Sequence, residues 1–339
     1  MDVRKNPPAI LFALFALSLP IAGRVKEKKV VREEITATGP AVLWREPADL
    51  ESRDLFYGAG GKESVPHGTF TFVKEDLDGT NPKFLIRDEK GHKWKVKLGI
   101  EARPETAASR IVWAVGYYTN EDCFVPDLQV QGMPARLHRG QKLIGLDGSV
   151  PNARLRREFA EEKVKKVGNW FWRHDAFTGT RELNGLKVVM AVINNWDLKD
   201  ENNAIYQEGG ERVYMVSDLG TAFGAAGRSW PRETAKGNLD AYKRSKFIRR
   251  VTDSTVDFQV PARPRYVYWV NPKEYWRRVH LEWIGKNVPR EDVRWMGHLL
   301  ARLSPKQIRD AFRAAGYSPQ EADEFAEVVQ QRIVMITDL

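Results

Sequence analysis

The chain has 339 residues, of which 42% are hydrophobic and 11% aromatic. That composition is enough to bury one large core or two modest ones, and it excludes a wholly disordered protein. The formal net charge of +9 favours anionic partners. Cys123 is the only cysteine, so an intramolecular disulfide and a cysteine-cluster metal site are both excluded.

The N-terminus has the pattern of an export signal. Arg4 and Lys5 precede an apolar run over residues 9–19, and the small residues Ala22 and Gly23 follow it. This pattern predicts a signal peptide over residues 1–23 and a periplasmic or secreted protein. The run is short for a membrane span, but an uncleaved anchor is the alternative, and it is the one route by which we expect membrane contact.

The next part of the chain is rich in strand patterns. Residues 24–55 are charged and irregular, which favours a linker or a strand lying on the domain. A glycine cluster follows at Gly58, Gly60 and Gly61. Alternating segments then predict strands over residues 69–73, 83–87 and 93–98, the last two joined by a hairpin turn at residues 88–91.

A helix is expected to begin at Pro104, because proline suits the first helical turn and apolar residues recur with helical spacing at Ala108, Ile111 and Val115. Irregular β structure is expected from residue 124 to about residue 150.

The second half changes character. Residues 186–193 favour a buried helix, and residues 204–206 and 213–216 favour two short strands. Capping-box patterns at Ser304 and Ser318 predict two C-terminal helices. We therefore expect an α+β, bilobal protein with a β-rich N-lobe over residues 56–165 and a mainly helical C-lobe over residues 166–339.

The central segment supplies groups that phosphoryl transfer needs. Residues 197–202 read Asp-Leu-Lys-Asp-Glu-Asn, and residues 218–220 read Asp-Leu-Gly. Transfer needs a carboxylate that orients the acceptor hydroxyl, a lysine near the phosphates, and hard oxygen ligands for a metal. Asp197 and Lys199 suit the first two roles as catalytic residues, and Asn202 and Asp218 suit the metal.

These two motifs resemble the catalytic loop and the metal-binding Asp-Phe-Gly element of protein kinases. The usual His-Arg before the catalytic aspartate is replaced by Asn195-Trp196, and the middle residue of the second motif is Leu219. The sequence is therefore more similar to the atypical branch, which includes HipA toxins, phosphoinositide kinases and secretory-pathway kinases. The resemblance implies ATP or another nucleotide triphosphate as cofactor, with Mg or Mn.

The first half completes the resemblance. Lys97 stands late on an expected strand, where kinases carry a phosphate-binding lysine, and Glu105 on the following helix is its expected partner, with Glu101 as the fallback. The glycines at residues 58, 60 and 61 could cover the phosphates with backbone N–H groups.

Each of these features alone has a structural explanation, since a strand lysine is usually solvated and a glycine cluster usually forms a turn. Their order along the chain favours an exported kinase-like phosphotransferase that acts on an unknown protein, sugar or lipid hydroxyl. Two alternatives remain: a nucleotide-binding pseudokinase without turnover, and an unrelated metal-dependent hydrolase that uses Asp197 and Asp218.

The remaining motifs give no further function. The six histidines lack metal-site spacing, and no nucleic-acid-binding module is present, so no nucleic-acid partner is expected. Basic clusters at residues 154–166 and 243–250 are usually solvated surfaces, although they could receive an acidic substrate.

Overall fold

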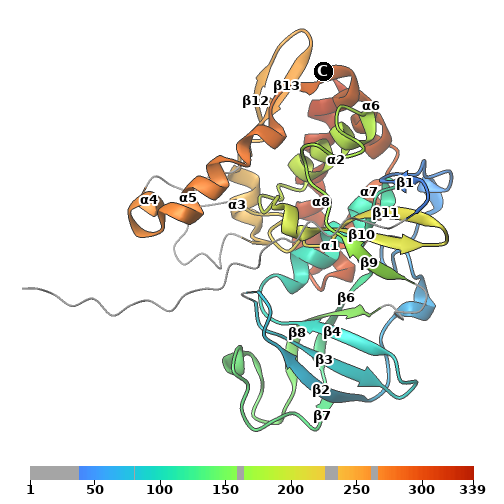
Figure 1. Ribbon diagram of the computed structural model, residues 1–339, viewed down its shortest axis with the longest axis vertical. Coiled ribbons are helices and arrows are strands. Elements are labelled where there is room, and N and C mark those ends of the chain that lie inside the picture. The colour runs from blue at the N-terminus through green and yellow to red at the C-terminus, as the bar shows by residue number, and fades with distance from the viewer. Residues whose placement is uncertain (1–37, 80, 159–163, 226–235, 261–265) are drawn as a thin grey trace, which may run out of the picture. The chain divides into compact units, whose positions relative to one another are not determined.

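A computed structural model describes residues 38–79, 81–158, 164–225, 236–260 and 266–339 (Figure 1). The chain divides into two units, Met1–Glu34 and Ile35–Leu339, and all the described residues lie in the second. The expected signal peptide and the start of the expected linker lie outside the described residues. None of the described helices is both long and apolar enough to cross a bilayer.

The first sheet has six strands in the order β6-β8-β4-β3-β2-β7. Their bounds are β2 (Phe70–Asp76), β3 (Lys83–Asp88), β4 (Lys93–Lys97), β6 (Asp122–Leu128), β7 (Val130–Gln131) and β8 (Val150–Arg157). Side chains alternate across the sheet, so Trp94 and Val96 enter an apolar core while Lys95 and Lys97 lie on the opposite face. The predicted strands and the hairpin turn between β3 and β4 are confirmed.

The second sheet belongs to the larger core. It contains β1 (Ala41–Val42), β5 (Tyr118–Thr119), β9 (Lys165–Gly168), β10 (Asn203–Glu208) and β11 (Glu211–Val216). A third, small sheet joins β12 (Ile248–Val251), β13 (Thr255–Phe258) and β14 (Val288–Pro289). The predicted pair of short strands corresponds to β10 and β11, which are antiparallel.

Of the α-helices in the described residues, all but α1 lie in the second half of the chain (Figure 1). Their bounds are α1 (Ala102–Ala114), α2 (Arg181–Val192), α3 (Leu239–Arg244), α4 (Tyr266–Val270), α5 (Pro272–Val279), α6 (Arg290–Ala301), α7 (Pro305–Ala314) and α8 (Pro319–Thr337). Short 3-10 turns are η1 (Leu50–Ser52), η2 (Lys62–Ser64), η3 (Gln141–Leu143), η4 (Asp200–Asn202) and η6 (Glu282–Gly285).

The helix predictions hold with small shifts at their ends. α1 begins two residues before Pro104, and α2 includes the predicted apolar segment. Ser304 and Ser318 each accept a hydrogen bond from the backbone N–H three residues later, and that residue's side chain bonds back to the cap. Both predicted capping boxes are therefore confirmed.

The linker prediction is wrong from Ala41 onwards. β1 pairs in parallel with β11, and Leu43, Leu50 and Leu55 are buried in the larger core. The sequence-level alternative, a strand lying on the domain, describes this part of the chain. Because apolar side chains anchor it at several points, residues 41–55 belong to the folded body.

α1 falls within the predicted N-lobe, residues 56–165, but several of its buried apolar side chains belong to the larger core. Its buried residues Ala108, Ile111 and Val112 join the larger core, and the helix packs against α7 as well as against β6 and β8. The β-rich lobe is thus the six-stranded sheet, and α1 lies between it and the helical lobe. The architecture is the expected α+β, bilobal fold.

Candidate active site

The centre of the site is Lys97, at the end of β4. Its Nζ lies 2.8 Å from Glu105 Oε2, 3.2 Å from Glu101 Oε2 and 3.3 Å from Asp218 Oδ1. The expected Lys97–Glu105 pair is therefore present, and the fallback residue Glu101 contacts the same lysine. Lys97 joins the first sheet, the start of α1 and the Asp-Leu-Gly motif in one buried cluster.

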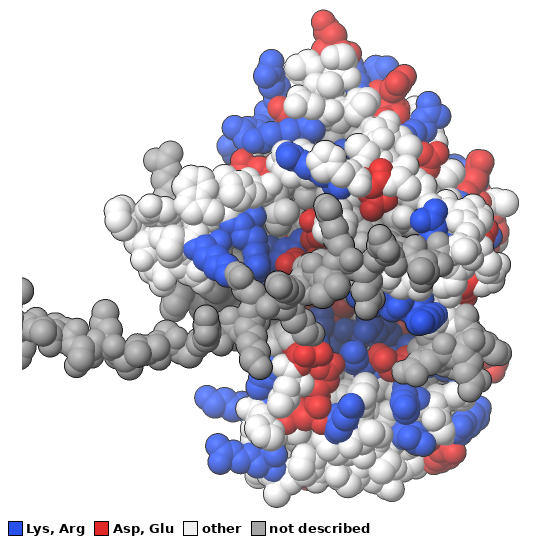
Figure 2. Space-filling model, viewed as in Figure 1, with Lys and Arg blue, Asp and Glu red and all other residues white. Residues whose placement is uncertain are grey.

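Further cations complete this cluster. Arg154 of β8 lies opposite Lys97 in the sheet, with its Nη2 3.3 Å from Glu105 and its Nε 3.4 Å from Asp122. Lys236, which follows the Asp-Leu-Gly motif, pairs with Glu101. Figure 2 shows Lys and Arg side chains gathered with Asp and Glu in the hollow beside the six-stranded sheet.

The charges in the cluster hold one another in place. Burial by itself lowers the pKa of Lys97, but the carboxylates of Asp218, Glu105 and Glu101 outweigh it and raise that pKa above its ordinary value. Burial raises the pKa of Asp218, yet Lys97 and the Gly220 N–H reverse the shift and lower it to about 2. Lys97 is therefore cationic and Asp218 anionic at neutral pH.

Glu105 behaves differently from Asp218. It is almost fully buried, with 1% of its surface exposed. Burial raises the pKa of Glu105, and the opposing effects of Arg154 and Lys97 do not cancel that rise. Glu105 is thus a buried partner that orients Lys97, while a third of the Asp218 side chain remains exposed to a ligand.

The Asp-Leu-Gly motif turns tightly after β11. The Gly220 N–H donates to Asp218 Oδ1 at 3.3 Å. A Cβ on Gly220 would lie 2.8 Å from Glu101 Oε2 and 2.9 Å from Glu101 Cβ, a spacing that real Cβ atoms do not show. Glycine at this position therefore lets Glu101 reach Lys97 past the turn.

The catalytic-loop motif follows the end of α2. Asn194 has a left-handed φ of 52°, which turns the chain out of the helix towards Asp197. Asn195 and Thr221 hydrogen-bond to each other, and the Asp197 N–H donates to Thr221 Oγ1 at 3.2 Å. These two polar residues, which the sequence motifs did not single out, tie the two motifs together.

Asp197 has both carboxylate oxygens engaged. Lys199 Nζ lies 3.0 Å from Oδ2, and Arg278 of α5 pairs with Oδ1. The Arg278 guanidinium also lies over the Trp196 ring, 5.0 Å from its centroid. Sequence reasoning missed Arg278, because it stands 81 residues after Asp197 in a segment with no recognised motif.

Asn202 closes the loop. Its Nδ2 donates to the Asp197 carbonyl at 2.7 Å, and its own carbonyl accepts from the Ser217 N–H at 2.9 Å, next to Asp218. With Nδ2 bonded, the amide oxygen of Asn202 is left for another partner, and its backbone lies one residue from Asp218. Mg²⁺ in kinase sites is bound by one or two such oxygen ligands together with phosphate oxygens, so this donor pair fits the expected metal.

That Gly58, Gly60 and Gly61 cover the phosphates stays a prediction, and their immediate surroundings do not support it. A Cβ on Gly58 would meet the Arg110 guanidinium, and one on Gly60 would meet Ser64 and Glu121. These glycines form turns before η2, and their close neighbours are none of Lys97, Asp197 or Asp218.

The turn between β2 and β3 lies nearer the cluster. Asn81 in this turn donates to Glu101, and Gly79 has a left-handed φ of 67°. The Arg139 guanidinium donates hydrogen bonds to the backbone carbonyls of Gly79 and Asp76, and these bonds hold the turn in place. The sequence could have indicated this turn, because the β2–β3 hairpin directly precedes β4, the strand that carries Lys97.

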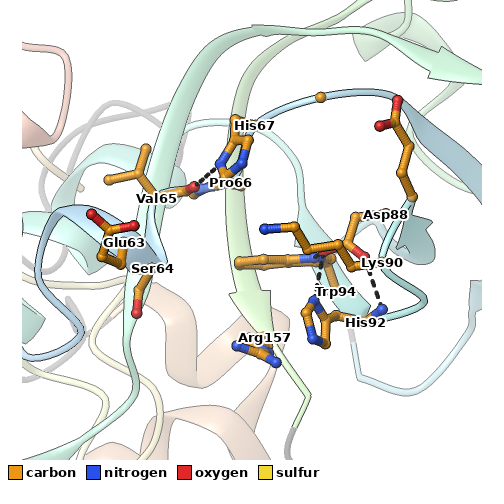
Figure 3. Close-up of a pocket in the computed structure, with 12 residues that line it drawn as sticks. Glu63, Ser64, Val65, Pro66, His67, Asp88, Lys90, His92, Trp94 and Arg157 are labelled. Carbon is orange, nitrogen blue, oxygen red and sulfur yellow. Dashed lines mark hydrogen bonds and ion pairs between the residues drawn. The ribbon is translucent and has the colours of Figure 1, made fainter.

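A separate cavity of about 160 Å³ lies at the other end of β4 (Figure 3). Its lining includes His67, Asp88, His92, Trp94 and Arg157. Asp88 accepts hydrogen bonds from the His92 backbone and from Trp94 Nε1, so its carboxylate is used within the β3–β4 turn. None of the cluster residues lines this cavity.

Among the described residues, no group of three or more His, Cys, Asp and Glu side chains is placed to hold a metal ion.

No family model and no curated protein matches this sequence. Among solved structures, the chain is similar to the Helicobacter pylori proinflammatory kinase CtkA, with 11% identity and a TM-score of 0.45 over 80% of this chain and 98% of that one. It is also similar to the Golgi casein kinase, with 11% identity and a TM-score of 0.32 over 85% of this chain and 78% of that one.

Proposed function

We propose that this chain is a kinase-like phosphotransferase that moves the terminal phosphate of ATP, or of another nucleotide triphosphate, to a hydroxyl acceptor. The observation that carries the proposal is the Lys97 cluster. One buried lysine joins Glu105 of α1 to the Asp218 carboxylate, and the Asp197 loop is tied to the same turn. A hydrolase that used only Asp197 and Asp218 would leave the buried Lys97–Glu105 pair without a role.

Each residue then has a chemical task. Lys97 holds the phosphates, with Glu105 fixing its direction, and Lys199 offsets charge on the transferred group. The acceptor oxygen forms a bond to the terminal phosphorus, the bond to the bridging oxygen breaks, and the nucleoside diphosphate leaves with that electron pair. Asp197 takes the acceptor proton. A bound Mg or Mn ion, held by Asn202 and Asp218, would supply charge neutralisation of the phosphates.

The arrangement around Asp197 sets a condition for turnover. Arg278 and Lys199 each pair with one carboxylate oxygen, so the acceptor hydroxyl must use a remaining lone pair of Asp197 or displace one of these cations. This observation favours a second candidate, a nucleotide-binding pseudokinase in which Arg278 keeps Asp197 blocked.

Binding and transfer measurements distinguish the candidates. ATP with Mn should raise the melting temperature of the full chain, and Asp218→Ala should abolish that rise. In a radiolabelled transfer assay, Asp197→Asn should slow transfer by about 10²- to 10⁴-fold while ATP binding stays nearly unchanged. Binding without transfer under varied metals and acceptors would favour the pseudokinase, and no ATP binding at all would reject both.

The proposed location is outside the cytoplasm, on the basis of the apolar run at residues 9–19 and the small residues after it. Cell fractionation of the native host tests this. A full-length protein found only in the cytoplasmic fraction would contradict it.

A further inference from the structure

The excess positive charge carried by one segment almost equals the net positive charge of the chain. Residues 241–290 contain twelve Lys and Arg against four Asp and Glu, which gives +8 of the net +9 of the whole chain. This segment includes β12, β13, α4 and α5. The proposed reaction uses only Arg278 from it.

The same segment exposes large aromatic side chains. Trp269 is 83% exposed, Val270 79%, Trp276 47% and Tyr268 39%. The Tyr268 ring lies 5.3 Å from that of Trp269 and 6.2 Å from that of Trp276, so the three rings form one surface. We call these four residues the aromatic tip.

Cations accompany the aromatic tip. Lys273 and Arg277 are exposed on α5, and Arg249 and Arg250 are exposed on β12. In Figure 1, α4 and α5 extend outward from the other helices, with α4 at the far end. In Figure 2 the same end is white, with Lys and Arg side chains beside it. The α4–α5 segment is thus apolar at its α4 end and carries exposed cations along α5.

This combination fits a lipid bilayer with anionic head groups. Trp and Tyr have an apolar ring and a polar edge, and they are favoured where hydrocarbon meets water. Lys and Arg near such a surface each contribute about 1 kcal/mol of attraction to anionic lipid. A bilayer also takes in a protruding tip without a complementary groove, whereas a folded partner needs one.

We propose that α4–α5 is a membrane-contact element that binds bilayers carrying anionic lipid. It is distinct from the apolar run at residues 9–19, to which the sequence pattern assigned any membrane contact. Because Arg278 of the same helix pairs with Asp197, binding holds the Asp197 loop near the lipid surface. Only the catalytic importance of that placement rests on the proposed function.

Sedimentation of the full chain with vesicles tests the proposal without nucleotide. The protein should bind phosphatidylcholine vesicles that contain phosphatidylserine, and it should bind pure phosphatidylcholine vesicles less. High salt should weaken the binding, because surface charge attraction is screened. Trp269→Ser with Trp276→Ser should lower the affinity by about tenfold or more, and Lys273→Gln with Arg277→Gln should remove the preference for phosphatidylserine.

Two controls locate the binding. Leu146→Ser changes a fully exposed apolar residue outside the segment and should leave binding unchanged. Leu14→Ser with Phe15→Ser disrupts the apolar run at residues 9–19, and binding that depends on phosphatidylserine should survive it. Because the residues substituted in α4 and α5 are all exposed, circular dichroism should show every variant folded.

Three outcomes would overturn the proposal. The first is no binding of the unmodified chain to either vesicle. The second is loss of all binding in the Leu14→Ser, Phe15→Ser variant, with none lost in the tip variants. The third is binding of the full chain to polyglutamate but not to vesicles, with that binding lost in the same tip variants. This result would make the partner an acidic polypeptide.

Discussion

At the scale of single residues, Lys97 offsets more charge than any other side chain described. It lies within 3.3 Å of three carboxylates, and only 6% of its surface is exposed. Buried carboxylates are tolerated only when they are paired, so removing this lysine affects both the fold and ligand binding.

We predict that Lys97→Met destabilises the protein by about 3–5 kcal/mol, because it leaves buried acids without their cation. Urea denaturation measures the change. Adding Glu105→Gln to Lys97→Met should recover part of the loss, since one uncompensated carboxylate is then neutral. Lys95→Met on the same face of β4 is the matched control, and its partly exposed salt bridges should cost about 1 kcal/mol or less.

The pKa shift of Asp218 predicts a pH dependence. Because the folded-state pKa is lowered to about 2 from 3.8, the Asp218 carboxylate contributes stability above pH 3.8, and that contribution is lost as pH falls towards 2. The melting temperature of the parent minus that of Asp218→Asn should therefore fall steadily over this range. A difference that grows towards low pH would contradict the assignment.

Glu105 contributes with the opposite sign. The pKa of Glu105 is raised in the folded state, so the folded protein binds the carboxyl proton more tightly than the unfolded chain does. The free energy of unfolding therefore decreases as pH rises through the ordinary pKa range of glutamate. The two acids should therefore be tested in separate variants, since a variant that neutralises both would mix the two trends.

At the scale of elements, the β2–β3 hairpin is held by the segment between β7 and η3. Arg139 lies between β7 and η3 and bonds to carbonyls at residues 76 and 79, while Glu75 accepts from the Arg139 N–H at 2.8 Å. The turn that lies beside Glu101 is therefore fixed by a distant part of the chain.

We predict that Arg139→Ala raises the KM for nucleotide several-fold with little effect on kcat, because the turn loses its support while Asp197 is untouched. Arg136→Ala is the matched control, since Arg136 is exposed in the same segment. Steady-state kinetics with nucleotide varied would measure both. An equal KM in the two variants would show that the turn does not contact the nucleotide.

At the scale of the whole molecule, residues 41–55 close the larger core. Leu50 is completely buried, and its carbonyl accepts from Gln307 Nε2 of α7 at 2.9 Å. The start of the folded chain and its C-terminal helices therefore stabilise each other.

We predict that Leu50→Ala costs about 2–5 kcal/mol, as other large-to-small changes in a core do. Leu77→Ala, at a position that is 55% exposed, should change stability by less than about 0.5 kcal/mol. Chemical denaturation of the two full-length variants compares them. Equal effects would mean that residues 41–55 are not part of the cooperative unit.

The sequence predicted what depends on local pattern. Alternation located β3 and β4, and capping boxes located α7 and α8. The motifs of Asp197, Asn202 and Asp218 predicted segments that the fold brings together. The sequence could not predict Arg278 or Arg139, because each reaches its partner through the tertiary fold. Nor could it predict what surrounds the glycine cluster, because glycine indicates only that the backbone turns, whereas contacts across the fold decide what lies beside the turn.

The packing of α1 determines which part of the molecule can move. Ala108, Ile111 and Val112 fix this helix in the helical lobe, while Lys97 belongs to the six-stranded sheet. The Lys97–Glu105 pair thus crosses from one packed body to the other. If the sheet rotates when a ligand enters or leaves, the length of this ion pair changes with the angle. The distance between a spectroscopic label on β4 and one on α1, measured with and without ligand, would therefore test whether the sheet moves relative to this helix.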